Sequence, residues 1–241
     1  MLTYQNDPSQ KEMFQVRFAE HRRLDEVIQG TGYSKGRGCF IGCTMNSYDH
    51  ESFSKSIAPY WMAKLADRIF EGLPRSEAAQ FGTDLLAAIP VGVKYDDLEK
   101  VRRVLSILRL EKLLALKSVK AAPKVEKSIN TIIDALKAEN SGIKQDWFEL
   151  RQQAWEVRSA YAYAAYAAAA AAAADAADAA DAAAAYAAAA AAAADAAAAA
   201  DAADDAAAYA AAAAADAADA ARKTHWQFER DNLLKLLGEI K

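Results

Sequence analysis

The sequence predicts an all-α fold, a compact multi-helix array forming a single domain over residues 1–241. Three observations support this prediction. Apolar residues recur at spacings of three and four along most of the chain. Pro and Gly divide it into segments of ordinary helix length. Residues 160–221 consist almost entirely of Ala, the best helix former, and Asp. No stretch reads as a convincing strand.

The first helix is expected to open with a capping box, in which Ser9 is followed three residues later by Glu12. Gly30 is expected to end it. Its apolar residues are Phe14, Val16, Phe18, Leu24, Val27 and Ile28.

Three prolines mark the starts of further helices: Pro59, with an end at Gly72, then Pro74 and Pro123. Another helix should begin at Asp96 and Asp97, and its expected end carries Lys117 and Lys120, which suit the helix dipole. A helix with Trp147, Leu150, Ala154 and Val157 leads into the Ala-rich segment. The expected core residues of the proline- and aspartate-initiated helices are Trp61, Met62, Leu65, Ile69, Phe70, Ala78, Phe81, Leu85, Leu86, Leu98, Val101, Val104, Leu105, Leu108, Val125, Ile129, Ile132, Ile133 and Leu136.

The chain therefore falls into three parts: amphipathic helices over 1–159, an Ala/Asp/Tyr segment over 160–221, and a C-terminal helix over 222–241. The middle part holds 48 Ala, 9 Asp and 5 Tyr. As one straight helix it would run about 93 Å, so its repeat of roughly twenty residues indicates about three closely packed helices. Asp175 to Asp181 and Asp201 to Asp205 are the candidate breaks, because Asp caps helices and favours turns. The C-terminal helix carries Trp226, Phe228, Leu233, Leu234, Leu237 and Ile240.

Composition and charge indicate a protein of the cytoplasm. The polar N-terminus does not resemble a signal peptide, no apolar run is long enough to span a bilayer, and two Cys suit a reducing compartment. The net charge of −4 divides unevenly, because the Ala-rich segment carries nine Asp and no base. The remainder is basic and could pair with this acidic part, although most such charges simply face water.

The first candidate for chemistry is the Gly-rich loop over 30–44. Lys35, Gly36, Arg37 and Gly38 could bind an anion, since several Gly allow backbone N–H groups to converge and the two bases add charge. A phosphate or nucleotide site is one interpretation. A tightly folded connector is the other, because no strand–loop–helix phosphate motif is present.

Metal chemistry has weak candidates in Cys39, Cys43 and His50, with His21 as a fourth ligand. The ligand spacing is incomplete, so we expect neither a metal nor another cofactor, and the two Cys would then be small packing residues. No nucleophile stands beside a base, and His225 is alone near Trp226, so no catalytic residue and no enzyme activity are expected. The Asp residues of the Ala-rich segment could mimic a phosphate backbone, but a solvated helix face explains them as well.

Three sequence features together resemble the all-helical immunity-protein-like family, the Imm-five-like group of phages and bacteria. They are the loop GRGCFIGCT at 36–44, the helix IAPYWMAKLADRIFEGLP at 57–74 followed by LAAIP at 86–90, and the Ala/Tyr/Asp tract. The resemblance covers most of the chain. Met45 and Asn46 stand where the family often has His, which weakens a metal site further.

The resemblance implies a non-enzymatic inhibitor in conflicts between bacteria, phages and plasmids. It would act by stoichiometric protein binding in the host bacterial cytoplasm, on a defence complex, a nuclease or a toxin, as anti-CRISPR proteins and antitoxins do. The alternative is a binder or sponge of a nucleotide or another phosphate-bearing molecule, which would use the Gly-rich loop. A structural protein that binds a flat surface such as ice is disfavoured by the irregular Asp spacing. An uncovered Ala face could also pair two copies as a homodimer.

Arg68 is the remaining candidate binding residue. Asp67 and Glu71 are four residues apart and share a helix face, with Arg68 turned to one side. We expect Asp67 to face the Gly-rich loop and Arg68 to pair with an acid from another helix, or else to lie solvated at the surface.

Overall fold

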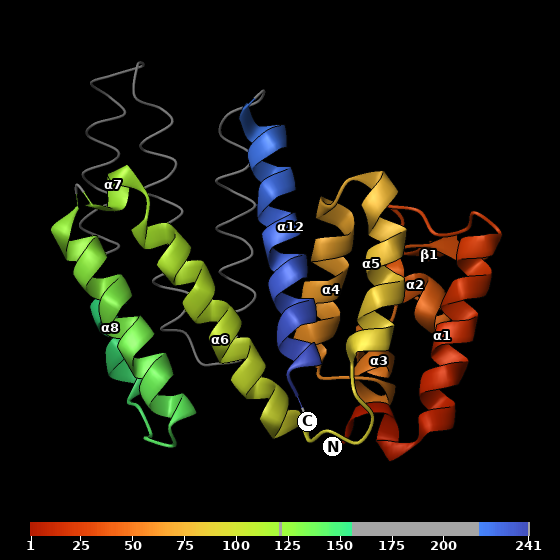
Figure 1. Cartoon of the computed structure of the whole chain (residues 1–241), viewed down its shortest axis with the longest axis horizontal. Coiled ribbons are helices and arrows are strands. Elements are labelled where there is room, and N and C mark those ends of the chain that lie inside the picture. Colours follow the sequence, from red (N-terminus) through yellow and green to blue (C-terminus); the bar gives the residue numbers. More distant parts are fainter. Residues whose placement is uncertain (121, 156–216, 241) are drawn as a thin grey trace. The chain divides into compact units, whose positions relative to one another are not determined.

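The computed structural model describes residues 1–120, 122–155 and 217–240, which are helical apart from a short hairpin and the connections (Figure 1). The all-α prediction is confirmed. The chain divides into two compact units, Met1–Val101 with Lys223–Lys241, and Arg102–Arg222. Within the described ranges, no helix combines the length and apolarity needed to cross a bilayer. The single domain expected over 1–241 stays a prediction.

The first unit begins with a 3-10 helix, η1 (Thr3–Asn6), and continues into α1 (Pro8–Arg23). Asp7 caps α1, because its carboxylate accepts a hydrogen bond of 2.8 Å from the backbone N–H of Ser9. A proline at the first helical position fixes the start. The predicted capping box of Ser9 and Glu12 is therefore wrong: both lie inside the helix.

The end of α1 also differs from the prediction, since the helix stops at Arg23 and not at Gly30. Asp25 takes a left-handed φ of 53°, which turns the chain out of the helix. The following residues run beside the Gly-rich loop, and the N–H of Ile28 donates to the carbonyl of Gly38 at 2.8 Å. Backbone pairing with the loop thus replaces the last expected turns of the helix.

The Gly-rich loop contains more regular structure than a connector. It forms a hairpin of β1 (Tyr33–Ser34) and β2 (Arg37–Gly38), followed directly by α2 (Phe40–Met45). A further helix, α3 (His50–Ser56), was not predicted. Asp49 caps α3 by accepting hydrogen bonds from two backbone N–H groups.

Helices α4 (Tyr60–Gly72) and α5 (Arg75–Ala88) confirm the boundaries expected from Pro59, Gly72 and Pro74. Their apolar residues face the core of the first unit as the spacing predicts. The buried residues confirmed here are Trp61, Met62, Leu65, Ile69, Phe70, Ala78, Phe81, Leu85 and Leu86.

The C-terminal helix, α12 (Ala217–Gly238), is longer than the predicted 222–241 at its start, because no Gly or Pro separates the end of the Ala tract from it. Trp226 lies against α4: a Cβ added at Gly72 would come within 2.0 Å of its indole nitrogen. Apart from this last turn of the tract, the three helices and breaks expected within 160–221 lie outside the described residues. The buried apolar residues of α12 are Trp226, Leu233 and Leu237.

The second unit takes the later part of α6 (Tyr95–Leu114), α7 (Lys117–Lys120), α8 (Pro123–Asn140) and a helix over 147–155. The single helix expected to reach Lys120 is wrong: α6 ends where the chain tightens to a hydrogen bond between residues three apart, from Leu116 N–H to the carbonyl of Leu113. Val104 and Leu108 are half-buried. The core of this unit is formed by Ile107, Leu110, Val119, Ala122, Val125, Ile129, Ile132, Ile133, Leu136 and Ala154.

Candidate functional site

The hairpin of the Gly-rich loop turns through Lys35 and Gly36, whose φ angles are 52° and 81°. Positive φ at both central residues is the requirement of a two-residue type I′ turn, which matches the twist of paired strands. Tyr33 pairs with Gly38 and Ser34 with Arg37 across it. The strands are only two residues long, so alternating hydrophobicity could not reveal them. Lys35 and Arg37 are exposed at the tip.

Several backbone N–H groups of this loop already have acceptors inside the protein. The N–H of Gly38 donates to the carbonyl of Glu26 at 3.0 Å, and the N–H of Cys39 donates to that of Thr31 at 2.8 Å. The N–H of Gly30 donates to the Glu71 carboxylate at 2.7 Å. These donors hold the loop in its own fold and are not left facing outward for a phosphate.

Helix α4 turns two carboxylates toward the loop, as expected for Asp67. Asp67 is buried and accepts a hydrogen bond of 2.8 Å from the Tyr48 hydroxyl, while Nε2 of His50 lies 3.3 Å from the same oxygen, Oδ2. Glu71, one turn later, holds the Gly30 N–H. Arg68 is half-buried, and its pairing with an acid from another helix stays a prediction.

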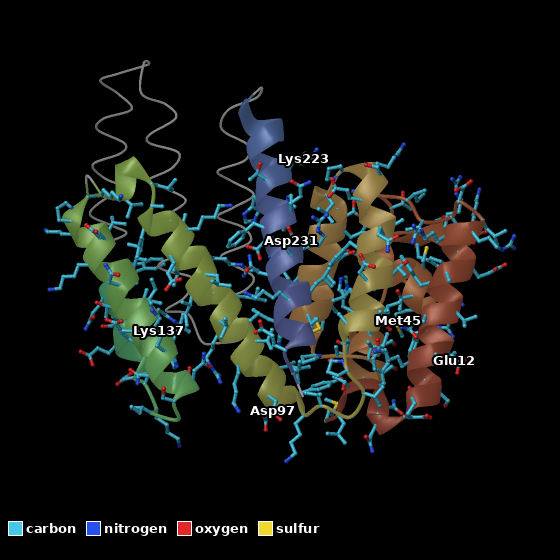
Figure 2. The ribbon with its side chains drawn as sticks, in the orientation of Figure 1. Glu12, Met45, Asp97, Lys137, Lys223 and Asp231 are labelled. Carbon is cyan, nitrogen blue, oxygen red and sulfur yellow. The ribbon has the colours of Figure 1, made fainter. Side chains whose placement is uncertain are left out.

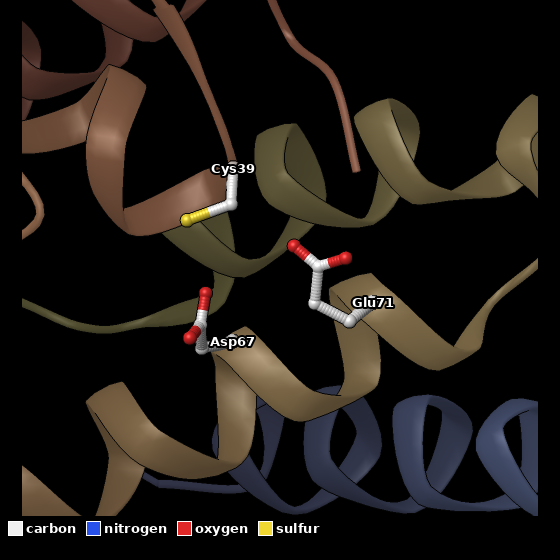
Figure 3. Close-up of side chains that lie close together, drawn as sticks. All are labelled: Cys39, Asp67 and Glu71. Atoms are coloured by element: carbon white, nitrogen blue, oxygen red, sulfur yellow. The ribbon is translucent and has the colours of Figure 1, made fainter. Parts of the chain in front are cut away.

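Cys39 joins these carboxylates from the other side. It is the N-cap residue of α2, and its Sγ accepts the N–H of Gly42 at 3.5 Å. Single ligand atoms of Cys39, Asp67 and Glu71 all lie within 4.8 Å of one another. Figure 3 shows the thiol and both carboxylates facing a common space between α2 and α4. A thiol and two carboxylates are thus concentrated at one end of the Gly-rich loop.

Their surroundings set the charge of each group. Burial raises the pKa of the Cys39 thiol, and the nearby Asp67 charge raises it further, so the thiol is protonated at neutral pH. For Asp67, burial favours the neutral form, but the neighbouring side chains of His50, Cys39 and Tyr48 outweigh it and lower the pKa. Burial and the Asp67 charge raise the pKa of Glu71 against the opposing effect of the Gly30 N–H.

The weak metal candidates from the sequence separate in the structure. The thiol of Cys43 donates to the carbonyl of Gly38 at 3.3 Å and so fastens α2 to the hairpin. His21 lies between Glu26, at 2.7 Å from Nδ1, and Asn46, at 2.8 Å from Nε2. Neither residue belongs to the cluster around Asp67.

Cys39 and His50 both lie at the cluster, on either side of Asp67. Asp67 and Glu71 are its carboxylate members, and neither was predicted as a ligand from the sequence. The spacing of two carboxylates one helical turn apart on α4 was the available signal. The approach of Cys39 to them depends on packing between α2 and α4, which local spacing cannot show.

A groove of about 870 Å³ lies between α1 and the hairpin. Three strongly exposed apolar side chains line it: Met13 at 43% and Val16 at 63% on α1, and Leu24 at 47% directly after the end of the helix. Phe14 and Phe18 lie on the buried face of α1, whereas the groove side carries Met13 and Val16 among charged and polar residues. The other lining residues are Ser9, Glu12, Arg17, Glu20, His21, Glu26, Tyr33, Gly36 and Asn46.

Comparisons with protein-family models, with curated proteins and with solved structures give no match for this chain.

Proposed function

We propose that this chain is a non-enzymatic immunity-type protein that binds a protein target stoichiometrically through the groove between α1 and the hairpin. The proposed setting is inhibition of a bacterial defence system by a phage or mobile element, in the manner of an anti-CRISPR protein or an antitoxin. The resemblance in the loop at 36–44 and the helix at 57–74 supports this setting. The exposed apolar side chains of Met13, Val16 and Leu24 in this groove are the observation that carries the binding surface.

Exposed Met13 and Val16 lie on α1, whose other side is packed in the core through Phe14 and Phe18, and exposed Leu24 follows the end of the helix. Isolated apolar residues at a surface are ordinary, but a row of them lining a groove favours a binding site. Covering apolar surface contributes about 25 cal/mol per Å². A partner that fills the groove would gain this contribution without disturbing the fold of the first unit.

The shape and rim of the groove indicate what kind of segment it takes. Glu12, labelled in Figure 2, is exposed on α1, and Glu20, farther along the same helix, is exposed and pairs with Arg23 at 2.6 Å. The groove runs beside a helix, as in complexes where an amphipathic helix of one protein lies in a groove of another. We therefore assign the occupant as an amphipathic helix of the target, with its apolar face inward and Lys or Arg toward the glutamates.

The nucleotide alternative has less support. Lys35 and Arg37 supply positive charge at the hairpin tip, but the loop N–H groups of Gly30, Gly38 and Cys39 already bind protein acceptors. A melting-temperature screen with cyclic and linear nucleotides tests it directly. A rise that is lost in Lys35→Ala and Arg37→Ala would favour nucleotide binding over the protein-binding function.

The binding surface is tested by co-purification from bacteria that carry defence systems, comparing wild type with Val16→Lys and Ala19→Lys. Val16 lines the groove, whereas Ala19 is an exposed residue of α1 outside it. Lysine at position 16 has glutamates four residues away on both sides, so the helix is preserved. We expect a stoichiometric complex with wild type and Ala19→Lys, and its loss with Val16→Lys. Equal retention in both variants would exclude this groove.

A further inference from the structure

The cluster of Cys39, Asp67 and Glu71 combines the ligand types of a transition-metal site. Thiolate and carboxylate are both ligands of zinc, and three protein ligands with a fourth open position are a common zinc arrangement. We propose that these three residues bind one divalent cation of the zinc class. The Tyr48 hydroxyl donates a hydrogen bond to Oδ2 of Asp67, and Nε2 of His50 lies 3.3 Å from the same oxygen.

Two buried polar atoms at the cluster have no hydrogen-bond partner, and they also point to a missing ligand. Asp67 is 9% exposed, yet its Oδ1 has no hydrogen-bond partner. His50 is 8% exposed, and its Nε2 lies near Oδ2 of Asp67 without forming an aligned hydrogen bond. Buried polar groups are nearly always satisfied. A cation bound at Oδ1 would satisfy the carboxylate and draw it into alignment with His50.

The positions of the three ligands suit closure around a small ion. In a tetrahedral zinc site, ligand sulfur and oxygen atoms lie about 3.6 Å apart, given Zn–S and Zn–O bonds of about 2.3 and 2.1 Å. The atoms here lie within 4.8 Å of one another, so a movement of about 1 Å completes the site. Glu71 is the exposed member and can make that movement, while Cys39 and Asp67 are buried and fixed on α2 and α4.

The ligand set also selects among metals. Magnesium and calcium take oxygen ligands and do not use thiolates, whereas zinc and cobalt accept sulfur, nitrogen and oxygen. Binding requires the Cys39 thiol to lose its proton: the S–H bond breaks, a metal–sulfur bond forms, and one proton is released to solvent.

Cobalt titration of the purified full chain tests the proposal, because a Co²⁺–thiolate bond gives a charge-transfer absorption band. We expect saturation at one equivalent, displacement of cobalt by zinc, and a higher melting temperature with zinc but not with magnesium. Cys39→Ser should abolish the band. Cys43→Ser is the matched control, because Cys43 is an equally buried thiol that donates to the backbone carbonyls of Glu26 and Gly38, and it should leave the band unchanged.

If Cys39→Ser fails to fold, Glu71→Gln tests the same metal site. Glu71 is exposed, and the amide oxygen of glutamine can still accept the Gly30 N–H, so this variant should fold and bind cobalt at least about tenfold more weakly. A wild-type protein without the band at excess cobalt would overturn the proposal. So would a band that persists in Cys39→Ser, or cobalt affinity unchanged in Glu71→Gln.

Discussion

Replacing Gly72 with Ala should destabilise the protein through a single contact between α4 and α12. A Cβ at this position would lie 2.0 Å from Nε1 of Trp226, 2.1 Å from Cδ1 and 2.3 Å from Cε2. All three atoms belong to one rigid indole that is 8% exposed, so the ring cannot move without disturbing its neighbours. Overpacking of this kind costs about 1–3 kcal/mol. An approach of 2.0 Å belongs at the upper end of that range, about 2–3 kcal/mol. Ala regains up to about 1 kcal/mol over Gly in a helix, so we expect a net loss of about 1–3 kcal/mol.

Urea denaturation followed by far-ultraviolet circular dichroism measures this change, and Gly238→Ala is the matched control. Gly238 is the last residue of α12, its φ is not positive, and an added Cβ would meet nothing within 4 Å. The same substitution there should be neutral or stabilise by up to about 1 kcal/mol. If Gly72→Ala were as stable as Gly238→Ala, the packing of α12 against α4 would be wrong.

Three further predictions concern the cluster at α4 and the buried thiols. Asp67→Asn should lower the free energy of unfolding at pH 7, and the difference from wild type should shrink as pH falls below about 4. The folded-state pKa of Asp67 lies below its ordinary value of 3.8, so the stabilisation by its carboxylate is lost when the group is protonated. A pH-independent difference would contradict this. Glu71→Gln should stabilise the metal-free protein at neutral pH, because the folded state disfavours the ionised form of Glu71, as its raised pKa indicates. An unchanged free energy of unfolding at pH 7 would contradict this. Neither Cys39 nor Cys43 should react with a thiol reagent at pH 8 until the chain unfolds, because both are buried. Burial also raises the pKa of Cys43 to about 11, so about one Cys43 side chain in a thousand is a thiolate at pH 8. Fast labelling of the native protein would contradict the burial of the two thiols.

The helices around α4 and α5 were predictable because their signals are local. Apolar residues at spacings of three and four define their buried faces, and Pro59, Gly72 and Pro74 define their ends. The start of α1 was also within reach: Asp7 before a proline is a better cap than Ser9 inside the first turn.

Other elements were missed because their signals are short or nonlocal. Helix α3 has Phe53 as its one buried apolar residue, and its start is marked only by the side-chain cap of Asp49. The hairpin turn puts positive φ on Lys35, a residue type with no preference for it, so only Gly36 indicated the turn. The cluster of Cys39 with Asp67 arises from packing between α2 and α4, which no spacing along the chain specifies.

Phage plating most directly tests whether the protein binds its target through the groove beside α1. Bacteria that carry an active defence system are given wild type, Val16→Lys or Ala19→Lys at equal expression, and the plating efficiency of a sensitive phage is measured. Wild type and Ala19→Lys should restore plating, whereas Val16→Lys should not. Restoration by all three proteins would contradict the groove as the binding surface, and restoration by none across the defence systems would contradict the inhibitory function.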